Sequence, residues 1–289
     1  MREDNVTIKG LWIGSKLSPN ELLCIKSYLY HGHQFELYVY DSVRNVPENV
    51  IIKDAAQIIP KSDIFTYTSV HHNRSLAMFS DLFRYKLLYK LGGWWSDLDA
   101  VCVKPFDIDQ PYVFMQEKLK DNKGTICGGV IKCPKNAQII DYCFEKSKEM
   151  SMNIQNYSWA ATGPSLLAQA VEEFNLNHFV TPPSYFSPIS FREITRLFTQ
   201  FDLSPATFSI HLFNEGWRMR NISKYGIYPK KSLIESLKKQ YEVKNNHIKL
   251  LSEFIKDIKE NGYNQGIKII KTKLWHMYNA FRNYPIDSE

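Results

Sequence analysis

Short apolar runs and longer amphipathic segments follow one another along the first half of the chain. Residues 21–31 place apolar side chains on one helical face, and Ser18 or Asn20 can cap this helix. Runs rich in apolar, aromatic and β-branched residues predict strands on both sides of it and further along. These runs are residues 6–14, 35–40, 50–53, 112–117 and 125–133. Strands that alternate with helices are typical of an α/β fold with a largely parallel sheet.

The most regular amphipathic segment covers residues 75–91. Its apolar residues recur every three or four positions, which predicts a helix with one face buried against a sheet. These residues are Leu76, Phe79, Phe83, Leu87 and Leu91. Asp81 and Arg84 are three residues apart and therefore point the same way. We expect their face of the helix to open toward a binding site, with the ion pair on an exposed surface.

Two carboxylates follow this helix after a sharp turn. Gly92 and Gly93 permit the positive φ that ends a helix, and residues 94–103 predict a strand. In a strand Asp97 and Asp99 would project to the same side, where their charges repel unless a cation is near. A solvated Asp pair is the commoner meaning of an isolated D-x-D. The preceding Asp-x-x-Arg and Gly-Gly-Trp-Trp make this one more specific, and we expect a Mn²⁺ or Mg²⁺ ion there.

Composition sets the size and the number of domains. A chain of 289 residues with 44% hydrophobic residues can bury the core of one large domain with an appendage. We expect a catalytic domain at residues 1–229 and a basic helical region at 230–289. Five cysteines without zinc-site spacing predict reduced core residues of a cytoplasmic protein. We also expect no leader peptide and no membrane-spanning segment.

Most of the net charge of +6 comes from the lysine-rich region after residue 230. Amphipathic helices bordered by lysines are typical of proteins that bind an anionic membrane surface. A helical cap that packs on the catalytic domain is the alternative, and it stays open at this point. No nucleic acid is expected as a partner, because the basic charge lies in this region while the carboxylate motif is acidic.

The run S-D-L-F-R-Y-K-L-L-Y-K-L-G-G-W-W-S-D-L-D at residues 80–99 resembles the signature of a sugar-transferase family with a D-x-D sugar-binding region. That family includes α-1,4-galactosyl-, N-acetylglucosaminyl- and mannosyltransferases and bacterial capsule or lipopolysaccharide enzymes. More remotely, the run is similar to the glucosyltransferase domain of clostridial toxins. The resemblance implies a GT-A fold, in which helices flank a single Rossmann-like mixed sheet, with a nucleotide-sugar donor, a divalent metal and retention of anomeric configuration.

The resemblance also assigns roles to residues of the motif. It implies that Asp81 binds hydroxyls of the donor sugar and that Arg84 contacts the sugar or a phosphate. Asp97 would hold the ribose or a water near the metal, and Asp99 would bind the metal itself. Family members have a similar late H-x-x-x-x-x-W segment, and the resemblance implies that His211 is a third metal ligand. Without the resemblance, a single histidine on a strand is usually structural.

Other contacts are expected around this motif. The catalytic candidates are Asp81, Arg84, Asp97 and Asp99; the metal candidates are Asp97, Asp99 and His211; and the nucleotide-sugar candidates are Leu11, Trp12, Ile13, Asp81, Arg84, Trp95, Asp97, Gly128, Gly129 and Trp217. Gly163 and Pro164 are the acceptor-side candidates, although Gly-Pro is also a common helix start. Trp12 can equally be a core residue. The pair His71 and His72 predicts solvated or hydrogen-bonded side chains at a helix entrance rather than metal ligands.

Together these patterns predict a metal-dependent retaining glycosyltransferase. It would move a hexose from a nucleoside diphosphate sugar, with UDP favoured, to a polysaccharide or lipid-linked glycan, working in the cytoplasm or peripherally at the inner membrane face. Front-face attack by the acceptor is expected, and a covalent carboxylate intermediate stays open. The alternatives are a nucleotide-sugar hydrolase, a non-catalytic sugar-binding protein or a nucleotidyltransferase. The last usually has a glycine-rich basic first loop, which the S-K-L-S-P-N after Gly14 does not provide.

Overall fold

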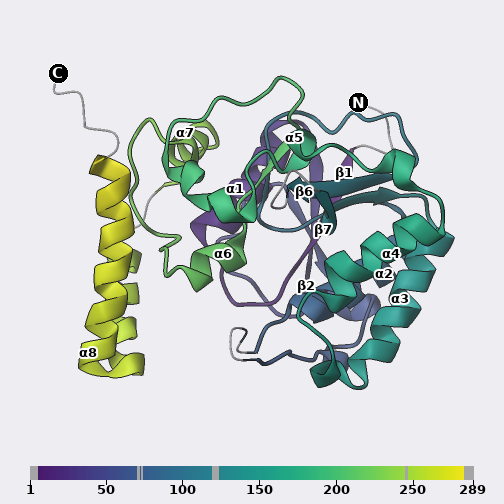
Figure 1. The fold of residues 1–289 in the computed structure, drawn as a ribbon, viewed down its shortest axis with the longest axis horizontal. Coiled ribbons are helices and arrows are strands. Elements are labelled where there is room, and N and C mark those ends of the chain that lie inside the picture. Colours follow the sequence, from purple (N-terminus) through teal and green to yellow (C-terminus); the bar gives the residue numbers. More distant parts are fainter. Residues whose placement is uncertain (1–5, 70–71, 73, 119–123, 245–246, 283–289) are drawn as a thin grey trace.

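The computed structural model describes residues 6–69, 72, 74–118, 124–244 and 247–282 (Figure 1). Its main sheet has six strands in the order β3-β2-β1-β4-β7-β6. The strands are β1 (Thr7–Trp12), β2 (Gln34–Val39), β3 (Val50–Asp54), β4 (Gly93–Ser96), β6 (Val113–Lys118) and β7 (Gly124–Cys133). Strands β1 to β4 run parallel, whereas β7 is antiparallel to β4 and β6 is antiparallel to β7. The predicted α/β fold with a mixed sheet is confirmed.

Helices cover both faces of this sheet (Figure 1). Helices α2 (Ala77–Leu91), α3 (Gln138–Ser151) and α4 (Leu166–Glu173) contribute to one core cluster, and α1 (Pro19–Tyr30) contributes to a second one. Adjacent strand residues point to opposite faces, so Trp95 lies in the first cluster and Trp94 in the second. The central strands of the sheet are therefore buried between two apolar layers, whereas the edge strand β3 is largely exposed.

The expected strand at residues 94–103 is wrong in one respect. The chain forms β4, leaves the main sheet, and then forms β5 (Ala100–Cys102), which pairs with β8 (Ser209–His211) in a separate antiparallel sheet. Asp97 and Asp99 lie in the turn between the two strands, where the Ala100 N–H donates to the Asp97 carbonyl at 3.1 Å. Aspartate is poorly suited to a strand interior, and the pairing of β5 with β8 redirects the chain here.

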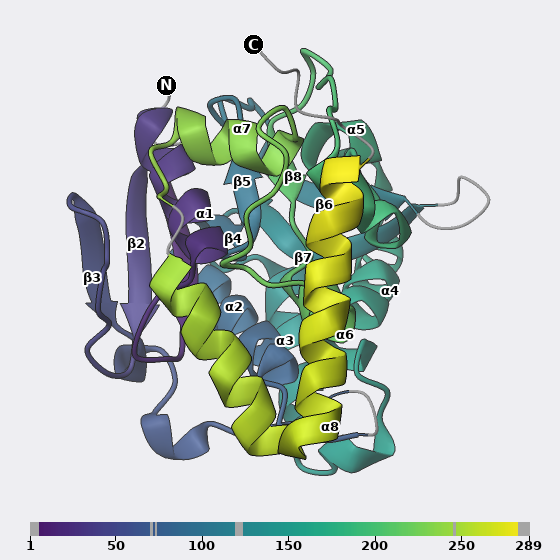
Figure 2. The same cartoon turned by 90° about the vertical axis from the view of Figure 1, so that its left-hand side faces the viewer.

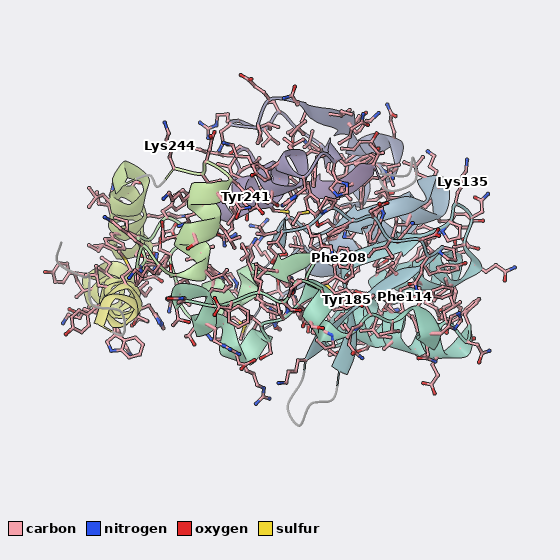
Figure 3. All side chains as sticks on the ribbon, turned by 90° about the horizontal axis from the view of Figure 1, so that it is seen from above. Phe114, Lys135, Tyr185, Phe208, Tyr241 and Lys244 are labelled. Carbon is pink, nitrogen blue, oxygen red and sulfur yellow. The ribbon has the colours of Figure 1, made fainter. Side chains whose placement is uncertain are left out.

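A third core cluster lies around the small sheet. It combines side chains of α6 (Asn214–Met219) and α7 (Leu233–Gln240) with Leu23 and Val101. Tyr241, at the end of α7, donates its hydroxyl to the Cys102 carbonyl at 2.8 Å, and Figure 3 labels this side chain. Residues after 229 thus share a core with the first part of the chain, and the division at residue 229 stays a prediction.

Two further α-helices, α5 and α8, lie in the described part of the chain. The short helix α5 (Pro183–Phe186) precedes β8, and α8 (His247–Arg282) forms two helical arms that meet at Gly262, where φ is 72° (Figure 2). A Cβ atom on Gly266 would lie 2.4 Å from the Ile258 backbone, and Lys273 pairs with Asp257 at 2.8 Å, so the two arms pack together. No helix in the described part of the chain is both long and apolar enough to span a membrane.

Candidate active site

The main sheet has a topological switch point between β1 and β4. The chain runs from β1 through α1 to β2, which pairs with one edge of β1. Strand β4 pairs with the other edge of β1. Ligands of open α/β sheets bind at the carboxyl ends of strands at such a point. A cavity of about 830 Å³ opens there, lined by residues 11–13 at the end of β1 and residues 97–99 after β4.

The Gly-Gly turn brings α2 beside β4. Gly92 and Gly93 have φ values of 65° and 77°, as predicted. Arg84 consequently lies between two carboxylates, with its Nη2 atom 3.2 Å from Asp81 Oδ1 and 3.0 Å from Asp97 Oδ1. The expected exposed ion pair is wrong, because Asp81 and Arg84 are only 6% and 5% exposed. This face of α2 lines the cavity from within the protein rather than from a solvated surface.

The surroundings of Asp81 and Arg84 hold both side chains in place. A Cβ atom on Gly128 would lie 2.0 Å from Arg84 Nη1, so the guanidinium requires glycine at that position. Thr162 donates its hydroxyl to Asp81 Oδ2 at 2.9 Å. Burial raises the pKa of Asp81, and Arg84 and Thr162 partly offset this. Both oxygens of Asp81 therefore have a partner already.

Asp97 is the more weakly ionised of the two motif carboxylates. Trp95 donates its indole N–H to Asp97 Oδ1 at 2.9 Å, on the oxygen that also faces Arg84. Burial raises the pKa of Asp97 to about 6, with Asp99 acting in the same direction and Arg84 against it. A cation bound beside Asp97 would lower this pKa and keep the carboxylate ionised near neutral pH.

Asp99 and His211 form a second charged group. His211 Nε2 lies 3.2 Å from Asp99 Oδ1, and Nδ1 lies 2.9 Å from Glu117 Oε1. The Asn214 backbone N–H donates to Asp99 Oδ2 at 2.8 Å. Burial alone would raise the pKa of Asp99, but His211, Asn214 and Lys224 outweigh it and lower this pKa to about 2. The two carboxylates likewise outweigh burial at His211 and raise its pKa.

This group has the chemistry of a divalent metal site. Two ligands at right angles, each about 2.1 Å from one Mg²⁺ ion, are about 3 Å apart, close to the observed separation of Asp99 Oδ1 and His211 Nε2. Glu117 occupies the other ring nitrogen, as a carboxylate that orients a metal-bound histidine does. The described residues contain no metal-binding group of three or more His, Cys, Asp or Glu side chains. The residues therefore fit an ion held by two protein ligands and by substrate phosphates.

Sequence reasoning missed a buried network behind Asp99. Glu21 is fully buried, and its Oε1 atom accepts from Asn214 Nδ2 at 2.9 Å and from Lys224 Nζ at 2.6 Å. Its Oε2 atom accepts from the Ser18 backbone N–H at 2.7 Å. The Ser-x-x-Glu pattern of a capping box could have located Glu21, whereas nothing in the local sequence identifies its contacts with Asn214 and Lys224.

A second missed group lies on the cavity wall. His72 Nδ1 is 2.8 Å from Glu215 Oε1, and the His72 ring stacks on Trp159 with centroids 4.6 Å apart and planes 7° apart. All three residues line the cavity. The prediction of a hydrogen-bonded histidine is confirmed for His72, while His71 lies outside the described residues.

The structure brings most of the candidate residues into one cavity. Its lining includes Leu11, Trp12, Ile13, Asp81, Arg84, Asp97, Asp99, Gly128, Gly129, Pro164 and His211. Trp12 is partly buried, and its indole nitrogen has no hydrogen-bond partner among the described residues. Because the ring both packs and faces the cavity, its stacking on a base stays a prediction.

Three candidates lie behind the lining. Trp95 is 1% exposed and contacts the site through Asp97. Trp217 is fully buried and donates to the Leu212 carbonyl at 2.8 Å, so it shapes the segment after β8. A Cβ atom on Gly163 would lie 2.8 Å from Asp81 Oδ2, so this glycine makes room for the carboxylate. All three influence the site through neighbouring residues, and direct contacts with a substrate stay predictions.

The motif region matches a known protein family. Residues 23–122 match the family described as "Glycosyltransferase sugar-binding region containing DXD motif". About a third of the chain is thus similar to a glycosyltransferase sugar-binding region. The match contains Asp81, Arg84, Asp97 and Asp99. The match confirms that the predicted D-x-D region is similar to this family, and it does not distinguish capsule or lipopolysaccharide enzymes from other branches.

Two curated proteins are similar in sequence. The "Uncharacterized glycosyltransferase L373" of Acanthamoeba polyphaga mimivirus is 26% identical over 179 residues, covering 59% of this chain and 66% of the viral protein. The "Subversion of eukaryotic traffic protein A" of Legionella pneumophila is 22% identical over 143 residues, covering 48% of this chain and 22% of that protein. The chain thus spans less than two thirds of the length of either relative.

Solved glycosyltransferase structures are also similar. The ligand-free glycosyltransferase domain of the YGT toxin has a TM-score of 0.47 at 9% identity, covering 93% of this chain and 94% of that one. "PaToxG Glycosyltransferase" has a TM-score of 0.45 at 17% identity, covering 59% and 69%. Because both scores are below 0.5, the functional assignment rests on the family match and on the site.

Proposed function

We propose that this protein transfers a hexose from a nucleoside diphosphate sugar, with UDP as the favoured nucleotide, to a glycan with retention of configuration. One observation carries this proposal. A single cavity at the sheet's switch point holds the Asp81–Arg84–Asp97 system beside the Asp99–His211 pair, and the matched family region supplies four of these five residues. The GT-A type of fold belongs to the same proposal.

The chain's own residues divide the work of binding the donor. Residues 11–13 would hold the nucleoside at the end of β1, and Asp81, fixed by Arg84 and Thr162, would accept hydrogen bonds from sugar hydroxyls. Asp99 and His211 would hold Mn²⁺ or Mg²⁺, and His211 Nε2 must first lose its proton. The bound ion would neutralise the negative charge of the departing diphosphate. Arg84 adds fixed positive charge beside the same cavity.

Retention by front-face attack is supported by the contacts of the carboxylates. A covalent route needs a carboxylate oxygen free to attack the anomeric carbon. Asp81 has Arg84 on one oxygen and Thr162 on the other, so it lacks such an oxygen. Arg84 and Trp95 share Asp97 Oδ1, so a covalent route would fall to Asp97 Oδ2. Attack by the acceptor on the face from which the diphosphate leaves requires no such free oxygen.

The proposal is tested by screening UDP- and GDP-sugars for nucleotide release with and without Mn²⁺. We expect metal-dependent release of the nucleoside diphosphate from a UDP-sugar, together with transfer once a suitable glycan is supplied. Release without transfer to any glycan indicates a nucleotide-sugar hydrolase. Production of pyrophosphate indicates a nucleotidyltransferase, and sugar binding without turnover indicates a binding protein. Each of these three results would overturn the transferase assignment.

The second arm of α8 favours an acceptor at a membrane. Its exposed side chains recur at helical spacing, with Leu274, Trp275 and Tyr278 at 46%, 59% and 62% exposure beside exposed Lys268 and Lys271. Lysines next to interfacial aromatic residues suit an anionic lipid surface. We therefore propose a cytoplasmic location with peripheral attachment at the inner membrane face, and a lipid-linked glycan of capsule or lipopolysaccharide type as the acceptor.

A further inference from the structure

A histidine paired with a carboxylate faces the cavity and has no part in the functions assigned above. His72 Nδ1 is 2.8 Å from Glu215 Oε1, although 143 residues separate the two in sequence. No described residue forms a hydrogen bond with His72 Nε2. When the ring is neutral, a carboxylate at Nδ1 holds the proton on that nitrogen and leaves the Nε2 lone pair available. This arrangement is that of a general base held in one tautomer.

The His72 ring is also fixed in orientation. It stacks on Trp159, whose indole N–H donates to Ser75 Oγ at 3.1 Å. Tyr67 is the other aromatic neighbour, with ring centroids 6.5 Å apart. A base that must meet a substrate proton needs a fixed ring, and stacking together with a hydrogen bond supplies one.

The charged neighbours of His72 keep its partner ionised. Glu215 is the acidic group at the ring, and Arg218 donates to Glu215 Oε2 at 2.8 Å and also contacts Oε1. Burial alone would raise the pKa of Glu215, but Arg218 and His72 outweigh it and lower this pKa. Glu215 therefore stays a carboxylate across the neutral range and can accept from Nδ1 throughout.

The pair of His72 and Glu215 lines the same cavity as the two parts of the donor site. Glu215 follows Asn214, whose backbone N–H binds Asp99 on the metal side. Trp159 lies three residues before Thr162, which binds Asp81 on the sugar side. If the roles assigned to Asp81 and Asp99 hold, the bond between sugar and diphosphate lies between them. His72 then lies on the wall of the cavity in which this bond breaks.

We propose that His72 is the general base that deprotonates the acceptor hydroxyl, with Glu215 as its positioning residue. In this step the acceptor oxygen forms a bond to the anomeric carbon, and the bond from that carbon to the diphosphate oxygen breaks. The diphosphate leaves with the electron pair of the broken bond, and the hydroxyl proton moves to His72 Nε2. The inference rests on the proposed function, and it narrows the acceptor to one that attacks through a hydroxyl.

The test compares His72→Gln and Glu215→Gln with the unaltered protein. A general base contributes about 10²- to 10⁴-fold in rate, so we expect His72→Gln to lower kcat for transfer by about 10²-fold or more. The pH–rate profile of this variant should lose the contribution of the base to its acidic limb and keep the contribution of His211 at the metal site. Glu215→Gln should lower kcat by about 10-fold or more. UDP affinity should stay within about 3-fold in both variants, because neither residue binds the donor.

Controls separate catalysis from structure. His31→Gln is the matched control, since His31 contacts the Tyr241 hydroxyl at 3.1 Å and is not among the cavity residues, and it should leave kcat and the pH profile unchanged. Added imidazole should restore part of the transfer rate of His72→Ala, which a purely structural role does not allow. Full transfer by His72→Gln with an unchanged pH profile would overturn the inference. Absence of UDP binding and nucleotide release in the unaltered protein would instead overturn the proposed function.

Discussion

The substitution Asp99→Asn separates the metal site from the fold. It keeps the side-chain volume and an acceptor for the Asn214 N–H, and it removes the negative charge that faces His211. Asp99 is the proposed metal ligand, and its loss weakens the stabilisation of the departing diphosphate by the ion. Metal-dependent turnover should therefore fall by about 10²-fold or more. The assay is Mn²⁺-dependent release of UDP from the preferred UDP-sugar, with thermal unfolding measured on the same preparation.

The expected effect on the free energy of unfolding is small because Asp99 stabilises the fold while the ionised Asp97 destabilises it. The pKa of Asp99 falls from 3.8 to about 2, which corresponds to roughly 2 kcal/mol of stabilisation that is present above pH 4 and lost as pH falls toward 2. The pKa of Asp97 rises from 3.8 to about 6, which costs roughly 3 kcal/mol at neutral pH, partly through repulsion from Asp99. Removing the Asp99 charge loses the first term and relieves part of the second.

We therefore expect the free energy of unfolding to change by less than about 2 kcal/mol while turnover collapses. Asp41→Asn is the matched control, because Asp41 is exposed and pairs with Lys61 outside the cavity. It should leave both quantities unchanged. Full turnover in Asp99→Asn refutes the metal assignment. Unfolding of this variant at room temperature refutes the claim that relief of repulsion at Asp97 offsets the loss of the Asp99 charge.

Three further variants test other parts of the structure. Arg84→Ala should lower the free energy of unfolding by about 3–5 kcal/mol as well as abolish donor use, because it leaves buried Asp81 without its charge partner; thermal unfolding and UDP release measure both effects. Gly128→Ala should weaken UDP-sugar binding by about 10-fold or more in calorimetry, since its Cβ displaces Arg84 and about 1.4 kcal/mol gives this factor. Reversing the charge of Lys268 and Lys271 together should lower binding to anionic vesicles at low salt by about 30-fold or more, at about 1 kcal/mol for each lost lysine.

Each of these predictions has a control. Unchanged stability in Arg84→Ala would show that the buried pair does not depend on the guanidinium charge. Gly129→Ala is the control for Gly128, because its Cβ would have its nearest contact at 3.2 Å with Met115 Sδ and would meet His211 Cε1 only at an ordinary contact distance of 3.7 Å. An equal effect of both substitutions would contradict the Arg84 explanation. Charge reversal of the exposed Lys146 and Lys148 on α3 should leave vesicle binding intact. Equal binding by the Lys268 and Lys271 variant would refute the membrane role.

Local signals predicted much of the fold. The glycines at 92 and 93 end α2 with positive φ because only glycine adopts that backbone without strain, and this is visible in the sequence. The turn at residues 97–99 was not predictable, because alternating apolar residues suit a continuous strand equally well. Its geometry depends on the pairing of β5 with β8, more than a hundred residues away.

The site was predictable in its motif and not in its surroundings. Asp81, Arg84, Asp97 and Asp99 lie within one local pattern, which is why sequence reasoning could group them. The pairing of His72 with Glu215 joins segments 143 residues apart, and no local period or spacing encodes it. Burial of the Asp81–Arg84 pair was also missed, because helical spacing identifies a shared face and does not say what covers that face.

A crystal structure of the protein grown with Mn²⁺ and UDP tests the central claim most directly. Anomalous scattering locates the ion without reference to the surrounding residues. The account predicts Mn²⁺ bound to Asp99 and to His211 Nε2, with the UDP diphosphate on the same ion and its nucleoside against residues 11–13. An ion bound away from Asp99, or a nucleotide bound outside this cavity, would contradict it.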